Sequence, residues 1–250
     1  MVCSCKTMNN NITLELAYLY PKLLNIYGDR GNVLTLLYRC KARGINLNIS
    51  TVGIGENTHP DRFDIYFIGG GQDEQQIKVA DDLQNKRKDL ISAVENHSVF
   101  LAVCGGYQLL GKYYKAQDGT ELKGIEALDL YTIAGKKRMI GNVICEELES
   151  NINLVGFENH SGKTYLGPNL KPLAKIIQGG GNNGEDGFEG VRHKNVFGTY
   201  LHGSLLPKNP ELVDKIIKLA LERKGLMMPE VQIDNSFEET AHKRAEKLKY

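Results

Sequence analysis

Two short apolar runs that each end in glycines constrain the fold of this chain more than any other feature. The first is FDIYFIGGG, residues 63–71, and the second is SVFLAVCGG, residues 98–106. Each run has the length and the continuous apolar character of a strand that is buried on both faces, as in a parallel sheet. Both glycine breaks therefore fall at the carboxyl ends of strands, which is the edge where open parallel sheets bind ligands.

The segments around these runs alternate between strand and helix patterns. The order is strand, helix, strand, strand, helix, strand, helix, and the elements outside the two runs are expected at 12–20, 28–44, 45–54, 74–96 and from 107 onward. Asp29 and Asn32 are possible N-caps of the first helix. This alternation predicts an α/β domain with a largely parallel central sheet.

The second half of the chain is richer in strands. Further strands are expected at 138–148, 152–158, 173–178, 188–191 and 196–201. The segment QGGGNNGEDG between two of them is typical of a hairpin or mobile loop. An amphipathic helix is predicted over 210–224, with proline in its first turn, and a last helix from about 236. We expect one domain over residues 12–225 and a tail over 226–250.

Composition excludes several classes of function. The 250 residues carry 31 basic and 30 acidic side chains, a formal net charge of +1. A chain so close to neutral has no strong field that would attract nucleic acid or an acidic membrane. Its apolar runs are far shorter than the roughly 18–20 residues that span a bilayer, so no transmembrane segment is expected.

The five cysteines are an odd and scattered set, which favours a reducing cytoplasm over a disulfide framework. Cys3 and Cys5 form a C-x-C pair in a polar leader, residues 1–11, which we expect to be flexible. Because no second pair of cysteines or histidines lies nearby to complete four ligands, we interpret them as incidental thiols and expect no metal site.

Cys104 is the strongest candidate for chemistry. It ends an apolar strand and precedes two glycines and a helix, in LAVCGGYQLL. A nucleophile on such a strand-to-helix turn is held out at the sheet edge, and small neighbours are needed because the turn leaves no room for side chains. The helix N-terminus favours the thiolate and offers free backbone N–H groups to an oxyanion. The alternative is a buried structural cysteine followed by a tight turn.

A thiolate nucleophile needs a base, and His202 is the best of the six histidines. It follows the apolar strand NVFGTYL and precedes Gly203 and Ser204, so it also lies at a strand's carboxyl edge. His160, in GFENHSG, follows another strand and could line the same pocket. The glycines 69–71 can supply a second backbone N–H to the oxyanion. The sequence contains neither of the phosphate-binding glycine motifs G-x-x-x-x-G-K-[ST] and G-x-G-x-x-G.

These pieces together resemble a known family. A GGG break after one strand, a turn reading VCGGYQ and a later TYLHG are similar to the triad-type, or class I, glutamine amidotransferases. The segment GFENHSG resembles the cobyric-acid-synthase-like branch. LYPKLLNIYGDRGN, KRMIGN and GFENHSGKTYLG resemble the GatD-type glutaminase subunits of lipid II isoglutaminyl synthases. The resemblance covers about residues 12–206 and implies a flavodoxin-like, three-layer fold.

The resemblance also implies a function. Subunits of this kind hydrolyse L-glutamine to glutamate and ammonia, and a MurT-type Mur ligase partner uses the ammonia to amidate the D-glutamate α-carboxyl of the lipid II stem peptide. ATP and magnesium are expected on that partner, and no cofactor on this chain. The implied place of action is the cytoplasm, at the inner face of the membrane, as a heterodimer.

The resemblance assigns roles to individual residues. Cys104 matches the nucleophile, His202 the general base, and Arg138 the residue that holds the substrate carboxylate, for which a forked guanidinium is well suited. The oxyanion would be held by the N–H of Gly105 and of Gly70 or Gly71. The other residues that we expect to bind substrate are Gln108 and His160.

One departure from the triad pattern leaves its third member open. Many triad amidotransferases have an acid two residues after the histidine, whereas this chain reads His202-Gly203-Ser204. Another acid of this chain, an acid of the partner, or a dyad without an acid are the three possibilities. The alternative functions are an amidotransferase of a cobyric-acid-synthase-like pathway, a stand-alone cysteine hydrolase, and a flavodoxin-like regulatory module with an inert cysteine.

Overall fold

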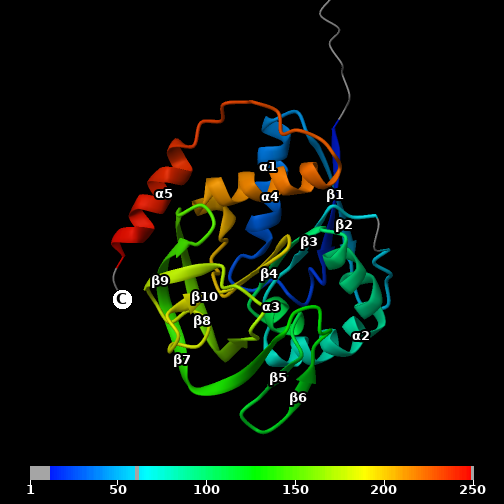
Figure 1. Ribbon diagram of the computed structural model, residues 1–250, viewed down its shortest axis with the longest axis vertical. Coiled ribbons are helices and arrows are strands. Elements are labelled where there is room, and N and C mark those ends of the chain that lie inside the picture. Colours follow the sequence, from blue (N-terminus) through cyan, green and yellow to red (C-terminus); the bar gives the residue numbers. More distant parts are fainter. Residues whose placement is uncertain (1–11, 60–61, 249–250) are drawn as a thin grey trace, which may run out of the picture.

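A computed structural model describes residues 12–59 and 62–248, and it contains two sheets and five α-helices over those residues. The leader with Cys3 and Cys5 lies outside the described residues. None of the helices in the described part is long and apolar enough to cross a membrane. The two sheets meet in the middle of the molecule, and helices lie along its upper and right-hand sides, whereas strands form its lower left edge (Figure 1).

The first sheet carries the two glycine-terminated strands at its centre. Its spatial order is β11-β12-β4-β3-β1-β2, and every neighbouring pair is parallel except β11 with β12 at the edge. The bounds are β1 Thr13–Leu19, β2 Asn46–Val52, β3 Ile65–Ile68, β4 Val99–Val103, β11 Val191–His193 and β12 Val196–Thr199. All residues of β3, β4 and β12 are buried, as expected for a parallel sheet covered on both faces.

Helices cover the two faces of this sheet. The crossover from β1 to β2 through α1, Arg30–Ala42, runs in the opposite direction along the sheet from the crossover from β3 to β4 through α2, Asp73–Glu95. Because both crossovers are right-handed, the two helices lie on opposite faces. Helix α4, Pro210–Arg223, contacts α1, and Figure 1 shows these two together, with α2 on the other side of the strands. The predicted α/β fold with a largely parallel central sheet is confirmed.

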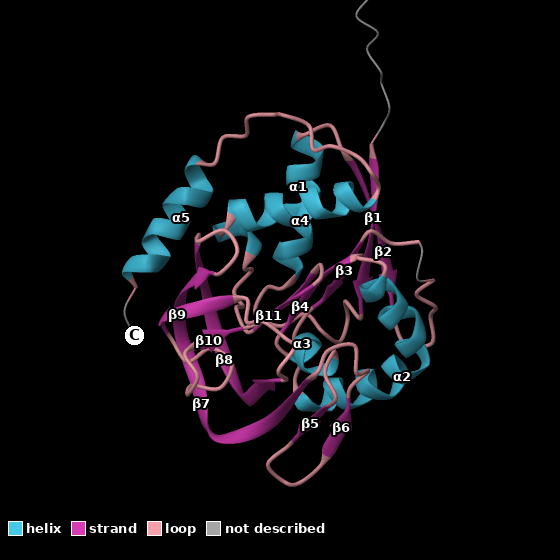
Figure 2. Ribbon diagram, viewed as in Figure 1, coloured by secondary structure: helices cyan, strands magenta, loops and turns pink. Residues whose placement is uncertain are grey.

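The second sheet is mostly antiparallel and is built from β5 to β10, the first six strands after α3, Gly105–Leu109 (Figure 2). Its two longest strands, β7 and β8, pair over most of their length. The bounds are β5 Tyr113–Lys115, β6 Glu121–Lys123, β7 Leu130–Glu147, β8 Asn153–Leu166, β9 Ala174–Gln178 and β10 Phe188–Glu189. β7 and β8 are therefore longer than the strands predicted at 138–148 and 152–158. The sequence analysis did not predict β5 and β6. The last helix, α5, spans Ser236–Lys247, close to the predicted start.

The prediction of one strand over 188–191 is wrong, because the chain changes sheets there. Gly190 has φ +63, and a Cβ on it would lie 2.3 Å from the carbonyl oxygen of Gly198. A left-handed residue pressed against a backbone must be glycine. The kink ends β10 in the second sheet and starts β11 in the first. The predicted QGGGNNGEDG hairpin is confirmed, since β9 and β10 pair antiparallel on either side of it.

A buried ion cluster fixes α1 against α4. Arg39, whose side chain is 1% exposed, donates from Nε and Nη2 to the two carboxylate oxygens of Asp214, at 2.7 and 2.8 Å. Arg43 donates from Nη2 to the same carboxylate at 2.6 Å. Arg39 Nη1 also donates to Asn235 Oδ1 in the segment before α5, at 2.8 Å. One carboxylate therefore holds both guanidinium groups, and Arg39 fastens the C-terminal segment to this cluster.

Asp214→Ala should destabilise the protein by about 3 kcal/mol, because it leaves the buried guanidinium of Arg39 without a counter-charge. Unfolding in urea measures this as a shift in midpoint at unchanged slope. The matched control is Glu222→Ala on the same helix, whose carboxylate makes only an exposed contact with Lys218, and it should cost less than about 1 kcal/mol. Equal effects of the two substitutions would contradict the role of the cluster.

Candidate active site

Cys104 stands on a strained turn between β4 and α3. Its φ of 51° and ψ of −109° lie in a region of backbone conformation where residues other than glycine are rarely found. Such a conformation costs on the order of 1–3 kcal/mol and persists where the surrounding structure imposes it. The turn requires the glycines that follow: a Cβ on Gly106 would lie 2.7 Å from the carbonyl oxygen of Ile68. The predicted nucleophile turn is present.

His202 lies shortly after β12, beside the same turn. Its backbone pairs with Phe157 of β8, with His202 N–H donating at 2.7 Å and Phe157 N–H at 3.2 Å. The imidazole is fully buried. A Cβ on Gly70 would lie 2.8 Å from His202 Cε1 and 3.2 Å from Cys104 Cβ. The histidine and the cysteine are thus neighbours across Gly70, as the sequence predicted, and only a glycine fits between them.

Asp29 is the acid that faces His202. Its Oδ1 lies 3.4 Å from His202 Nδ1, and its Oδ2 accepts the N–H of Gly70 at 2.7 Å. The carboxylate is fully buried. Asp29 occupies the predicted N-cap position of α1, but its side chain makes no capping hydrogen bond. Sequence reasoning considered it only as a cap, although it follows β1 at the same carboxyl edge as Cys104 and belongs to the segment LYPKLLNIYGDRGN.

The surroundings of His202 stabilise its protonated form. Burial lowers the pKa of the imidazole, but the charge of Cys104, hydrogen bonds with Asp29 and Cys104, and the charge of Asp29 raise it, and the net result is a pKa of about 10. The ring nitrogen Nε2 is buried and has no other hydrogen-bond partner among the described residues. His202 is therefore held by Asp29 through Nδ1, with Nε2 left for proton transfer.

A cavity of about 300 Å³ opens beside Cys104. Loops and helices at the carboxyl edge of the first sheet line one side of it, and β5, β7 and β8 of the second sheet line the other, so Cys104 and the strands β7 and β8 face the same space. Five of the predicted site residues are among the lining residues: Gly71, Cys104, Gln108, Arg138 and His160. The others that line it are Ile26, Tyr27, Gln72, Gln76, Tyr114, Asn159, Ser161 and Gly162. This size is at the lower end for small-molecule sites.

Two backbone N–H groups remain for an oxyanion. Gly105 is the first residue of α3, so its N–H has no partner within the helix. The prediction left a choice between Gly70 and Gly71. The N–H of Gly70 is engaged by Asp29, whereas that of Gly71 makes no hydrogen bond to the described residues. Gly71 therefore fits the role, and Gly70 serves instead as the contact between Asp29 and the glycine turn.

Arg138 reaches the cavity from β7. Its guanidinium donates from Nε to Asn159 Oδ1 at 2.5 Å and from Nη2 to the Asn159 carbonyl at 3.1 Å. No carboxylate of the described residues lies within ion-pair distance of it. A planar cation held only by a neutral amide, at the mouth of a cavity, is suited to binding the carboxylate of a ligand.

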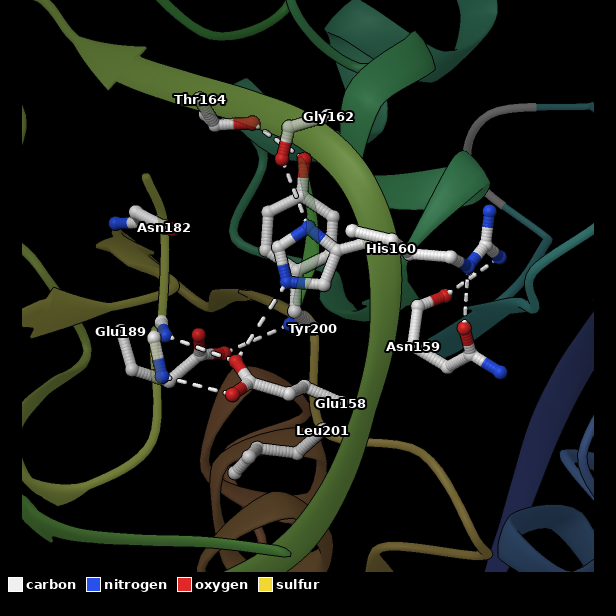
Figure 3. Close-up of polar contacts among 12 residues, drawn as sticks. Glu158, Asn159, His160, Gly162, Thr164, Asn182, Glu189, Tyr200 and Leu201 are labelled. Carbon is white, nitrogen blue, oxygen red and sulfur yellow. Dashed lines mark hydrogen bonds and ion pairs between the residues drawn. The ribbon is translucent and has the colours of Figure 1, made fainter. Parts of the chain in front are cut away.

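His160 forms one wall of the cavity and is rigidly packed (Figure 3). Its ring stacks on Tyr200 with a centroid distance of 3.5 Å and an interplanar angle of 4°, and its Nδ1 is 2.8 Å from the carbonyl oxygen of Gly162. Gln108 Nε2 donates to Tyr200 Oη at 3.0 Å. The two predicted pocket residues are thus joined through one buried tyrosine and shape the cavity together.

Two acids lie behind this wall. Glu158 Oε2 is 3.7 Å from His160 Nε2, and its carboxylate accepts the N–H groups of Gly180 and Gly181. Burial raises the pKa of Glu189 to about 7, against hydrogen bonds from Thr199 and the backbone that lower it. Figure 3 shows both acids on the side of His160 away from Asn159. Neither lines the cavity, so they support its wall from behind.

Comparisons with known proteins agree with this geometry. Residues 15–210 match the CobB/CobQ-like glutamine amidotransferase domain. The glutamine-hydrolysing lipid II isoglutaminyl synthase subunit GatD of Staphylococcus aureus is 42% identical over 215 residues, 86% of this chain and 87% of that protein. The corresponding subunit of Streptococcus pneumoniae is 39% identical over 222 residues, 88% of this chain and 85% of that protein.

A solved structure shows the same fold at low identity. PurLQS from Thermotoga maritima has a TM-score of 0.58 and 17% identity, and the match covers 84% of this chain and 98% of that chain. The fold that the family resemblance implied is thus supported by both the sheet order and this likeness.

Asp29→Asn should reduce stability most at low pH. A folded-state pKa of His202 raised from 6.5 to about 10 contributes stability that is fully present below pH 6.5 and lost as pH rises through 10. Asparagine removes the negative charge of Asp29 and so lowers that pKa. The difference in unfolding free energy between the unmodified protein and the variant should therefore be larger at pH 6 than at pH 10.

Urea titrations at the two pH values measure this difference. Glu222→Gln, on the exposed surface of α4, is the control and should show the same small difference at both. A loss of stability in Asp29→Asn that does not change between pH 6 and pH 10 would mean that Asp29 does not stabilise protonated His202.

Proposed function

Because this chain belongs to the CobB/CobQ-like glutamine amidotransferase family, we propose that it is the glutaminase subunit of a lipid II isoglutaminyl synthase. It hydrolyses L-glutamine, and its ammonia is used by a MurT-type ligase subunit to amidate the D-glutamate α-carboxyl of the stem peptide. ATP and magnesium belong to that partner. The heterodimer works in the cytoplasm at the inner face of the membrane, where its lipid-linked substrate is.

One observation carries the proposal: Cys104 and Arg138 line the same cavity, although Cys104 follows β4 of the first sheet and Arg138 lies on β7 of the second. The cation can hold a carboxylate while the thiolate reaches an amide at the other end of the ligand. This is what free glutamine requires. The identity of 39–42% to GatD subunits, over 85–87% of their length, supports the assignment to lipid II amidation.

Before the reaction, the proton of the Cys104 thiol has passed to His202 Nε2, and it stays there because the surroundings raise the pKa of His202 to about 10. In the first half of the reaction, the thiolate attacks the side-chain amide carbon of glutamine, and the carbonyl oxygen becomes an oxyanion held by the N–H groups of Gly71 and Gly105. Losing one such donor typically costs about 10²–10³ in rate. The C–N bond then breaks, and protonated His202 gives its proton to the leaving nitrogen, which departs as ammonia.

In the second half, water hydrolyses the thioester. Neutral His202 accepts a proton from the water as its oxygen attacks, and the same two N–H groups hold the second oxyanion. Collapse breaks the C–S bond, releases glutamate and restores the Cys104 thiolate beside protonated His202. Asp29 makes these transfers efficient, because it stabilises the imidazolium and keeps Nδ1 from competing with Nε2.

The position of Asp29 favours one of the three sources for the third triad member. It comes from this chain, although it lies 173 residues before the histidine rather than two residues after it. The separation of 3.4 Å is longer than an ordinary N–H···O hydrogen bond. A partner that docks beside this loop and shortens the contact would raise the activity of the glutaminase, which would link ammonia release to assembly.

Cys104→Ala should abolish glutamine hydrolysis and leave the fold intact, because it removes the nucleophile from a turn that alanine can occupy as cysteine does. The purified chain with its MurT-type partner is assayed for glutamate release and for amidation of the stem peptide. Free ammonia should restore amidation in the variant, since ligation occurs on the partner. Cys40→Ala, which removes a buried thiol from α1, is the control and should retain hydrolysis.

The same assay separates the alternatives. A stand-alone hydrolase would release its product at the same rate without a ligase. A regulatory module with an inert cysteine would release no glutamate even before substitution. An amidotransferase of a cobyric-acid-synthase-like pathway would hydrolyse glutamine but support no amidation of the lipid II stem peptide.

Arg138→Lys should weaken glutamine binding, because a point charge cannot make the two parallel hydrogen bonds of a guanidinium. The loss of a charge-assisted contact is worth about 1.5–3 kcal/mol, which is roughly 10–150-fold in kcat/KM. Steady-state hydrolysis measures the effect, and Lys137→Ala, the exposed neighbour, is the control. Unchanged KM and kcat in Arg138→Lys and in Arg138→Ala would remove Arg138 from the site.

A further inference from the structure

The loop before α1 encloses His202 from two sides. Asp29 faces Nδ1, and the ring of Tyr27 lies edge-on to the imidazole with a centroid distance of 5.0 Å and an interplanar angle of 71°. Tyr27 has φ 52°, a conformation that a bulky residue adopts only where its surroundings impose it. Its side chain is 43% exposed, so hydrophobic burial of the ring does not account for the strained backbone.

A hydrogen bond from the other sheet holds this tyrosine. Asn159 of β8 donates from Nδ2 to Tyr27 Oη at 2.8 Å. Through its Oδ1, the same amide accepts a hydrogen bond from Arg138 Nε. Figure 3 shows Asn159 on the opposite side of β8 from His160, so its amide is directed away from the packed wall behind the cavity. One asparagine therefore joins the loop of the first sheet to the arginine of the second.

Arg138 depends on this asparagine for its position. The pairing of β7 with β8 is interrupted between Ala134 and Met139, so Arg138 is outside the regular ladder. Its side chain is exposed, and both of its hydrogen bonds go to Asn159. Without these hydrogen bonds, a long, exposed side chain beside a strand irregularity would populate many rotamers. Ordering it in one rotamer on ligand binding would cost conformational entropy and weaken binding.

We infer that Asn159 and Tyr27 are positioning residues that hold the guanidinium of Arg138 over the cavity and connect it to the imidazole of His202. The inference rests on the proposed function, in which Arg138 binds the substrate carboxylate. Asn159 occupies Nε and one N–H of Nη2, which leaves Nη1 and the second N–H of Nη2 to bind the two oxygens of a carboxylate. Tyr27 Oη accepts a hydrogen bond from Asn159 and so holds its amide in place, and the ring of the same tyrosine packs edge-on against the imidazole of His202. Substrate binding and proton transfer thus share one anchor.

Because the hydroxyl of Tyr27 contacts Asn159 and its ring contacts His202, removing the hydroxyl and removing the ring should have different kinetic effects. Tyr27→Phe removes the acceptor for Asn159 and keeps the ring, so it should raise KM for glutamine with kcat little changed. Tyr27→Leu removes the ring as well and should also lower kcat. Asn159→Ala should raise KM by about tenfold, the effect of one lost hydrogen bond to a charged group.

Double substitution tests whether these residues act through Arg138. Asn159→Ala combined with Arg138→Ala should have the same kcat/KM as Arg138→Ala alone, because the asparagine has nothing left to position. Asn153→Ala and Tyr38→Phe are matched controls: Asn153 is on β8 with its amide turned to Glu246, and Tyr38 is 55% exposed on α1. Both should leave KM and kcat unchanged. Effects of Asn159→Ala and Arg138→Ala that multiply would overturn the inference.

A second readout does not depend on glutamine turnover. Iodoacetate and iodoacetamide alkylate the same thiolate, but only iodoacetate carries a carboxylate. The ratio of their rates at Cys104, measured by peptide mass analysis, reports how well a cation is placed over the cavity. Asn159→Ala and Tyr27→Phe should lower this ratio several-fold, towards that of Arg138→Ala, and Asn153→Ala should leave it unchanged.

The two readouts keep the failures apart. A chain that hydrolyses no glutamine but shows the expected alkylation ratios would contradict the proposed function and support the positioning pair. A ratio that falls in Arg138→Ala and stays unchanged in Asn159→Ala would overturn the positioning role. A ratio that is unchanged in Arg138→Ala would contradict the role of the arginine itself, and with it the inference.

Discussion

The buried carboxylate of Asp29 is the contact on which the rest of the site depends. One of its oxygens faces His202 Nδ1 and the other accepts the Gly70 N–H, so a single group orients the base and fastens the glycine turn that separates the base from Cys104. A buried charge is tolerated only when its partners satisfy it. Here those partners are an imidazole whose pKa is raised and the backbone N–H of Gly70.

The sheet order explains why these groups meet. β12, β4, β3 and β1 are consecutive parallel neighbours, and their carboxyl ends lead to His202, Cys104, the glycine turn and the Asp29 loop. Glycine is required where these ends converge, because a Cβ on Gly70 would overlap both His202 and Cys104. The strain at Cys104 has the same origin: a thiol that must emerge between two crowded neighbours cannot adopt an ordinary backbone conformation.

Local patterns predicted the parts of this structure that local sequence determines. Cys104 and His202 follow apolar strands, and their positions at the sheet edge could be read from those strands alone. Asp29 could not be recognised in the same way, since its partner lies 173 residues later and its place before a helix suggested a cap. The sheet change at Gly190 depends on contact with Gly198 in another strand, and the short pair β5 and β6 has too few residues for a periodic signal.

The division of labour between the two sheets has a physical consequence. The groups assigned to bond breaking follow strands of the first sheet, whereas Arg138, Asn159 and His160 lie on strands of the second. The backbone pairing of Phe157 with His202 fixes the sheets behind the base, and the Tyr27–Asn159 hydrogen bond joins them at the mouth of the cavity. A ligand carboxylate on Arg138 adds a charged contact at that mouth. Because the reacting amide must lie about 3–3.5 Å from the thiolate, and a misplacement of about 1 Å can cost about 10²-fold in rate, a small change in the angle between the sheets alters catalysis before it alters folding.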